Sequence, residues 1–220
     1  MTAKTIIAHD IPPLNLLQTG KDAFHMLSDY HVKHLPVVSE GAYLGLLSEE
    51  DLFTHKLYEP IGEYDLDHLR RHAVREDEHI FEVIRLMGDH RLTIIPVTDH
   101  DGRYLGLITQ NDLLRYFSST SALSESGAIL VLEMSRRDYS LANICRLIEE
   151  DDVKVLSAFV TSTPDPDFLQ VTLKLNRHDL ARSIATLERH EYEVKQSFGE
   201  IEHSDQLRER YESLLNYLNI

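Results

Sequence analysis

The sequence predicts an α+β protein of two modules, a duplicated strand-and-helix unit followed by a compact βαββαβ unit. Three observations lead to this prediction. The segment "YLGLLSEEDL" at 43–52 returns as "YLGLITQNDL" at 104–113. The small polar stretch "SSTSALSES" at 118–126 then interrupts the chain. After this stretch, the spacing of apolar residues no longer matches that of the two repeats, which indicates a second module with a different fold.

Composition narrows the class of protein. The chain has 220 residues, 42% of them hydrophobic, which is enough for packed cores. Its net charge of −15 disfavours binding to nucleic acid or to anionic membrane surfaces. No apolar run approaches the roughly 20 residues of a membrane span. The single cysteine, Cys145, cannot form an internal disulfide, and the first residues show no secretory signal. We therefore expect a cytoplasmic protein without membrane contact.

The duplicated unit divides into repeats at about 1–58 and 59–118. "HLPVV" at 34–38 matches "IIPVT" at 94–98, an offset of 60 residues. Between the matched strands, one extra residue of the second copy falls in a hairpin loop around Asp101-Gly102. Each repeat is predicted to contain a short strand, an amphipathic helix, a buried strand, a hairpin, a second strand and a second helix. The predicted short strands are Leu14–Leu17 and Ala73–Arg75, and the predicted first helices are about 21–30 and about 79–89.

A linker at 119–126 leads to the second module, 127–220. Apolar runs predict strands at 128–134, 154–162, 168–175 and 192–198, and helical spacing predicts helices at 140–150 and 179–190. This βαββαβ order is the ferredoxin-like pattern. A last helix is predicted behind a Ser204 N-cap. Its apolar stripe consists of Leu207, Tyr211, Leu214, Leu215 and Leu218.

The repeat preserves polar residues as well as apolar ones. Ser48 and Asp51 recur as Thr109 and Asp112, where a strand ends and a helix begins. One interpretation is helix capping, in which the hydroxyl accepts a backbone N–H and the carboxylate complements the helix dipole. The other is ligand binding, because a carboxylate at this place can accept hydrogen bonds from both hydroxyls of a ribose. Duplication of the pattern predicts two equivalent clefts.

The stretches "KHLPVVSEGAYLGLLSEEDL" and "TIIPVTDHDGRYLGLITQNDL" resemble a tandem pair of cystathionine-β-synthase-type (CBS) domains. Both carry the apolar-Pro-Val strand, the apolar-Gly-apolar strand and the S/T-x-x-D of that family, and the resemblance covers residues 1 to about 118. It implies repeats packed about a pseudo-twofold axis, with adenosyl ligands in the clefts. It also implies that Asp51 and Asp112 hold ribose, while Ser48 and Thr109 hold ribose or phosphate.

The same resemblance places the residues before the Pro-Val strands in the clefts. These are Lys33 and His34 in the first copy and Thr93 in the second. Lys33 and His34 could face phosphate, whereas the second copy is less cationic and has only Arg91 nearby. The alternative for Lys33 and Arg91 is ordinary solvated surface.

The βαββαβ unit resembles an ACT domain, a family often used for amino-acid binding and regulatory association. That family usually has a glycine between its first strand and first helix. Here the loop is "SRRDYSL", with Tyr139 at about that position. A bulky ring argues against the usual amino-acid site and favours a dimer-forming module. The order of a CBS pair and then an ACT domain resembles acetoin-utilisation-type regulatory proteins.

Other residues offer little chemistry. His68 and His72 have the i, i+4 spacing of zinc ligands, but no cysteine and no H-E-x-x-H accompany them, so a polar helix face is the simpler interpretation. Cys145 lies in an apolar stripe and is expected to be a buried small hydrophobe. The chain shows no catalytic constellation, so we predict that it is not an enzyme.

We therefore expect a regulatory homodimer that senses AMP, ADP, ATP or another adenosyl compound through its CBS pair. The signal would pass to the ACT-like module or to an unidentified regulated protein. One alternative is an interaction scaffold with empty clefts. A third, from another class, is a metal hydrolase built on His and Asp.

Overall fold

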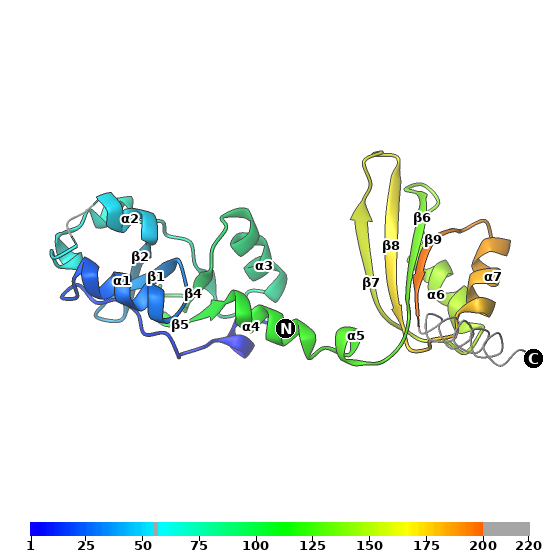
Figure 1. Ribbon diagram of the computed structural model, residues 1–220, viewed down its shortest axis with the longest axis horizontal. Helices are drawn as coiled ribbons and strands as arrows, with labels where there is room; N and C mark the ends of the chain where they lie inside the picture. The colour runs from blue at the N-terminus through cyan, green and yellow to red at the C-terminus, as the bar shows by residue number, and fades with distance from the viewer. Residues whose placement is uncertain (55–56, 200–220) are drawn as a thin grey trace, which may run out of the picture. The chain divides into compact units, whose positions relative to one another are not determined.

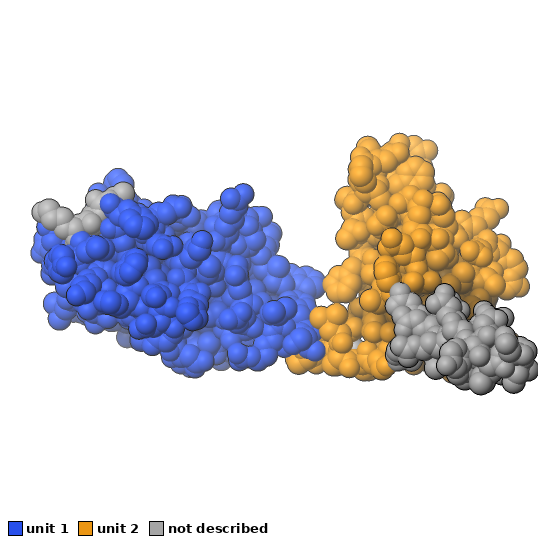
Figure 2. Space-filling view, in the orientation of Figure 1, with its two compact units in different colours: residues 1–118 blue, residues 119–220 orange. Residues whose placement is uncertain are grey.

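The computed structural model describes residues 1–54 and 57–199. The chain forms two compact units, Met1–Ser118 and Ser119–Ile220 (Figure 2, blue and orange). The predicted C-terminal helix, with its stripe from Leu207 to Leu218, lies outside the described residues. No helix in the described part of the chain is long and apolar enough to cross a membrane.

The first repeat forms a hairpin between two helices. Its elements are α1 (Gly20–Asp29), β1 (His34–Ser39), β2 (Ala42–Ser48) and α2 (Glu49–Thr54), preceded by the 3-10 turn η1 (Ala3–Ile6). The predicted strand Leu14–Leu17 is wrong except at Leu14, which makes a single parallel bridge to Val37. The reason is Asn15, whose side-chain oxygen accepts the N–H groups of Leu17 (2.9 Å) and Gln18 (3.2 Å) and turns the chain.

The second repeat has the same plan (Figure 1). Its elements are β3 (Val74–Arg75), α3 (Ile80–Asp89), β4 (Ile94–Thr98), β5 (Tyr104–Thr109) and α4 (Gln110–Ser118), after the turns η2 (Ile61–Glu63) and η3 (Leu66–His68). β3 runs parallel to β4, and β4 pairs antiparallel with β5. The two hairpins have the same register: His34 pairs with Ser48 in the first repeat, and the equivalent residues Ile94 and Thr109 pair in the second. The predicted duplication is thereby confirmed.

Each hairpin pairs with a segment near the start of the other repeat. Leu46 of β2 lies opposite Pro36 of β1 on one side, and on the other side its N–H donates to Arg70 O at 2.8 Å. Leu107 of β5 exchanges two hydrogen bonds with Ala8, at 2.8 and 3.2 Å. The repeated glycines make room for these crossings. A Cβ on Gly45 would lie 2.6 Å from Leu69 Cβ.

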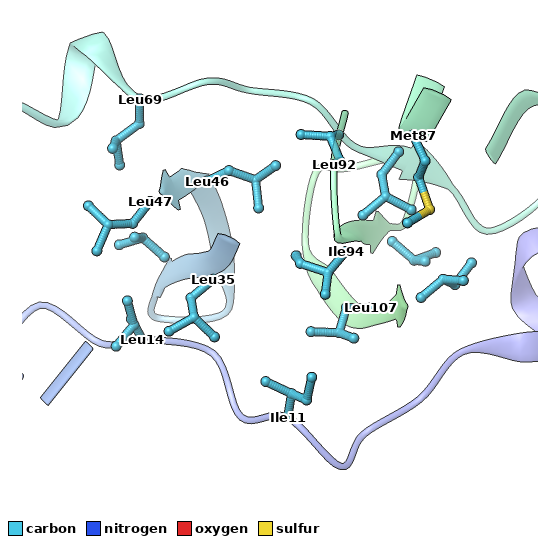
Figure 3. Packing of buried hydrophobic residues seen from close by; sticks show 14 of the residues in the cluster. Ile11, Leu14, Leu35, Leu46, Leu47, Leu69, Met87, Leu92, Ile94 and Leu107 are labelled. Atoms are coloured by element: carbon cyan, nitrogen blue, oxygen red, sulfur yellow. The ribbon is translucent and has the colours of Figure 1, made fainter. Parts of the chain in front are cut away.

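The two repeats share one hydrophobic core. Figure 3 shows side chains from β1 and β2 and side chains from β4 and β5 around the same interior. Leu35, Leu47, Ile94 and Leu107 are all fully buried in this cluster, and Ile11 packs against them from the N-terminal segment. Burial of each such side chain stabilises the fold by about 1.5–3 kcal/mol relative to exposure. The pair of repeats is therefore a single packing unit.

The second unit has the predicted ferredoxin-like fold, which is confirmed. Its strand order is β7-β8-β6-β9, with every neighbouring pair antiparallel. The elements are β6 (Ile129–Ser135), α6 (Leu141–Glu149), β7 (Val155–Ser162), β8 (Phe168–Leu175), α7 (Ala181–Arg189) and β9 (Glu193–Phe198). Alternation along β6 and β8 buries every second side chain beneath α6 and α7 (Figure 1).

The predicted linker at 119–126 is partly helical. A short helix, α5 (Ser121–Ser124), lies within it. It begins because Thr120 O accepts the N–H groups of Leu123 (2.9 Å) and Ser124 (2.8 Å). Ser, Thr and Ala are compatible with a single helical turn as well as with an open linker. The composition of this stretch therefore did not predict the turn.

Candidate functional site

Ser48 and Asp51 form a closed hydrogen-bonded box at the start of α2. The Asp51 Oδ2 atom accepts the Ser48 N–H at 2.7 Å and the Ser48 hydroxyl at 2.6 Å. The Asp51 N–H donates back to Ser48 Oγ at 3.3 Å. The strand-to-helix junction imposes this geometry, because the first helical N–H groups have no partner within the helix.

Thr109 and Asp112 repeat the box at the start of α4. Oδ2 of Asp112 accepts the Thr109 N–H at 2.9 Å and its hydroxyl at 2.7 Å, and the Asp112 N–H donates to Thr109 Oγ1 at 3.0 Å. The Asp112 side chain is 14% exposed, and its Oδ1 faces Arg115 Nη1 at 3.7 Å. The predicted capping geometry is therefore present in both copies.

A third box of the same kind precedes α1. Thr19 and Asp22 also spell T-x-x-D, and Asp22 Oδ2 accepts the Thr19 N–H at 2.8 Å and its hydroxyl at 2.7 Å. These hydrogen bonds, the one from the Thr19 backbone first, lower the pKa of the Asp22 carboxyl. The sequence analysis did not single out this pair. It shows that the box by itself is a helix cap, so any binding role of Asp51 and Asp112 depends on what surrounds them.

The residues before the two Pro-Val strands meet each other where the repeats join. Thr93 Oγ1 accepts the Lys33 N–H at 2.9 Å and lies 3.1 Å from His34 Nδ1. The Thr93 N–H also points at His34 Nδ1, at 3.4 Å. One junction is thus formed by Lys33 and His34 of the first repeat and by Thr93 of the second, which follows them by 60 and 59 residues.

A cleft of about 440 Å³ opens beside this junction, and we call it the first cleft. Its lining residues are Lys33, His34, Ser48, Glu49, Glu50, Arg70, His90 and Arg91. Four of the eight residues predicted from sequence therefore line one cleft, including Arg91 from the second repeat. Thr93 adjoins it through His34, and Asp51 adjoins it through Ser48. Thr109 and Asp112 occupy the equivalent place in the other repeat.

The sequence analysis missed Glu49, Glu50, Arg70 and His90. Glu49 and Glu50 lie inside the S-x-x-D segment, so the motif itself could have indicated them. Arg70 and His90 come from outside the first repeat, and no local pattern links them to Ser48. Arg70 reaches the cleft because its backbone crosses β2 at Leu46.

Electrostatics in the first cleft favour anions without being uniformly positive. Lys33, Arg70 and Arg91 supply three cations, opposed by Glu49 and Glu50. His34 is 7% exposed. Burial, followed by the charge of Arg70, lowers the pKa of its ring below the usual value, while Asp51 and Glu50 act in the opposite direction.

The paired histidines, predicted to share a polar helix face, do not lie on one helix, because His68 ends the turn η3 and His72 follows it outside any helix. His68 pairs with Asp65 at 3.2 Å, whereas the His72 ring stacks on His90 with centroids 3.8 Å apart. Among the described residues, no group of three or more His, Cys, Asp or Glu side chains is placed to hold a metal ion.

The second unit bears on two further predictions. Tyr139 packs against the core of this unit, between β6 and α6, at the position where the ACT family usually has glycine. Cys145 is half-buried rather than buried, and burial raises the pKa of its thiol. A cleft of about 530 Å³, which no sequence pattern indicated, lies between the α6–β7 and β8–α7 connections.

The first unit thus belongs to a class of tandem modules in which two copies of one small fold enclose a cleft at their junction. The comparison with protein families agrees, since residues 3–58 and 68–119 match the CBS domain. The chain therefore carries a CBS-domain pair followed by a ferredoxin-like unit.

Several known proteins are similar to this chain. The magnesium transporter MgtE of Thermus thermophilus is 31% identical over 106 residues, 47% of this chain and 23% of that protein. A solved CBS domain pair/ACT domain protein from Thermotoga maritima is 23% identical, covers 53% of this chain and 96% of its own, and has a TM-score of 0.48. The cytosolic domain of the Mg²⁺ channel MgtE in complex with ATP is 26% identical, covers 52% and 48%, and has a TM-score of 0.44. The chain spans about a quarter of the curated relatives' length.

Proposed function

We propose that this chain is a non-catalytic regulator whose CBS pair senses an adenine nucleotide or another adenosyl compound. The observation that carries the proposal is the first cleft. It brings Lys33, Arg70 and Arg91 to one opening beside the Ser48–Asp51 box. Three cations suit phosphate groups, and a carboxylate one helical turn away suits ribose hydroxyls.

The second box, Thr109–Asp112, is proposed to hold the ribose of a ligand in the other repeat. Where the first repeat has Lys33 and His34, the second has Thr93 and Ile94. We therefore propose that the first cleft prefers phosphorylated ligands and that the second tolerates a ligand with fewer phosphates. AMP, ADP and ATP are the compounds to compare.

A ligand can regulate only if it binds one conformation better than another. The shared core and the segment crossings connect the cleft to both repeats, so a ligand that orders the cleft also favours one arrangement of the whole CBS pair. We propose that this change is relayed to the ferredoxin-like unit or to a partner protein. Tyr139, packed at the usual glycine position, supports an associating role for that unit rather than amino-acid binding.

The experiment is a calorimetric titration of the full chain with AMP, ADP, ATP, NAD and S-adenosylmethionine. Saturable heat with at least one compound supports the proposal. No heat with any of them, together with unchanged melting temperatures, favours the alternative of a scaffold with unoccupied clefts. Metal analysis of the purified protein addresses the remaining alternative, because a His/Asp hydrolase would retain stoichiometric metal.

We also propose a homodimer in the cytoplasm. The single cysteine fits a reducing compartment. Aromatic and aliphatic side chains on the first helix of each repeat are solvent-exposed, with Phe24 at 44%, Phe81 at 66% and Ile84 at 37%. A twofold contact would cover such a surface. Light scattering should give twice the 25.4 kDa of one chain, and a monomer mass at micromolar concentration would contradict this.

A further inference from the structure

His34 is the residue that makes the two repeats unequal. It begins β1, is 7% exposed and lines the first cleft. The equivalent residue that begins β4 is Ile94, which is fully buried and cannot ionise. A titratable ring thus stands at the junction of the repeats on the side of one cleft only.

Hydrogen bonds define the protonation state of this ring in the free protein. The backbone N–H of Thr93 points at His34 Nδ1, so this nitrogen is an acceptor and the neutral ring carries its hydrogen on Nε2. Thr93 Oγ1 accepts the Lys33 N–H and lies 3.1 Å from Nδ1, so its own hydrogen is available to donate to the ring. The network is satisfied with His34 neutral.

Charged and titratable groups from four segments face His34. They are Lys33 before β1; Glu49, Glu50 and Asp51 at the start of α2; Arg70 before β3; and His90 and Arg91 at the end of α3. Burial and the cations Arg70 and Lys33 oppose a proton on the ring, which lowers its pKa, whereas Asp51 and Glu50 favour the proton. The balance between the neutral and the protonated His34 ring therefore depends on how much negative charge the cleft holds.

We propose that an anionic ligand enters the first cleft together with one proton, which His34 Nδ1 takes up from solvent. A phosphate group beside the ring adds negative charge to that of Glu49, Glu50 and Asp51, so it shifts the balance toward the protonated ring. The Thr93 hydroxyl then turns, so that the new Nδ1–H donates to Oγ1 and the direction of this hydrogen bond reverses, while the Thr93 N–H loses its acceptor at Nδ1. This inference rests on the proposed function, and it adds that the sensor reports nucleotide and pH jointly.

The reversal involves both repeats, because His34 and Lys33 belong to one and Thr93 to the other. Uptake of one proton makes the association constant rise at most about tenfold for each unit of falling pH. By reciprocity, the bound ligand raises the pKa of His34, and the gain in its proton affinity equals the total gain in ligand affinity between the neutral and the protonated protein. The second repeat, with Ile94 in place of the ring, contributes no such dependence.

His34→Asn is the decisive variant. The side-chain oxygen of Asn can take the acceptor position of Nδ1 toward Thr93, but Asn cannot be protonated. His100→Asn is the matched control, since His100 is an exposed ring of the same unit that lies by Asp77 (3.8 Å) and not in the lining of the first cleft. Calorimetry with ATP at pH 6 and pH 8, in buffers of different ionisation enthalpy, counts the protons taken up by each protein.

We expect the ratio of ATP association constants at pH 6 and pH 8 to be larger in the native chain and in His100→Asn than in His34→Asn, by roughly threefold to thirtyfold. Protonation of ATP itself is common to all three proteins and cancels in this comparison. Equal ratios and equal proton uptake would overturn the inference and leave the proposed function standing. Absence of ATP binding to the native chain at both pH values would overturn this inference, and the proposed function only if the other adenosyl compounds also fail to bind.

Discussion

Substituting Asp51 and Asp112 by asparagine separates helix capping from ligand binding. In each box, Oδ2 of the carboxylate accepts the backbone N–H and the hydroxyl of Ser48 or Thr109. The amide oxygen of Asn can replace Oδ2 in these contacts. The other carboxylate oxygen becomes an NH₂ group, which donates and cannot accept from a ribose hydroxyl. The double variant thus keeps its caps and loses the proposed sugar contact.

The expected magnitude follows from that lost acceptor. A hydrogen bond to a charged group contributes about 1.5–3 kcal/mol, which is roughly tenfold or more in affinity. A ligand at a hundred times its dissociation constant stabilises a one-site protein by about 2.7 kcal/mol. After a tenfold or hundredfold loss of affinity, the same concentration stabilises it by about 1.4 or 0.4 kcal/mol. At about 4 °C per kcal/mol, the melting shift falls from about 11 °C to between about 2 and 6 °C.

The assay is thermal melting with and without ATP at a fixed concentration. Asp22→Asn is the matched control, because the Thr19–Asp22 box has the same contacts but does not line the first cleft. It should keep the full ligand-induced shift. If the double variant keeps that shift as well, all three boxes are helix caps and the ribose role of Asp51 and Asp112 is refuted.

Four further predictions concern residues of the first unit. Gly106→Ala should destabilise the chain in urea by about 1–3 kcal/mol, because Gly106 has φ +150° and a Cβ there would lie 2.4 Å from Ile7 Cγ2. Gly88→Ala, in α3 with no atom within 4 Å of the new Cβ, should instead stabilise it by about 0.4–1 kcal/mol. The free protein should lose stability as pH falls below about 6.5, since the lowered pKa of His34 leaves the unfolded chain holding more protons; His34→Asn should flatten this loss, and an unchanged profile would contradict it. Lys33→Ala should weaken ATP by roughly fivefold and adenosine far less, whereas equal losses would argue against a phosphate contact.

Local patterns predicted the elements whose own residues determine them. The period-two alternation in β6 and β8 and the apolar stripes of α6 and α7 were sufficient for the ferredoxin-like topology. The strand expected at Leu14–Leu17 failed because Asn15 offers the backbone a competing turn, an interaction that apolar periodicity does not register. The turn α5 was missed for a similar reason, since small polar residues fit both a linker and a single helical turn.

The candidate site was predictable only in part, because a cleft between repeats draws its residues from distant segments. Ser48 and Lys33 were indicated by their own repeat. Arg70 and His90 were not, because their position follows from how one repeat packs on the other. The Thr19–Asp22 box shows that a motif alone does not identify a site. It forms the same hydrogen bonds as the two candidate boxes but does not line the first cleft.

Because of the crossings at Leu46 and Leu107, the two repeats of the first unit exchange their N-terminal segments and are not two independent domains. The opening residues of the chain pair with the second repeat, through Ala3 to Glu78, Lys4 to Glu76 and Ala8 to Leu107. In the same way, the first segment of the second repeat pairs with the first repeat, where Arg70 O accepts the Leu46 N–H. Each half is therefore completed by the beginning of the other. Loss of the first eight residues would remove the segment that pairs with β5, the strand that ends at Thr109. The segment that pairs with β2, the strand that ends at Ser48, would remain. Truncation at the N-terminus would therefore first destabilise a strand near the middle of the sequence.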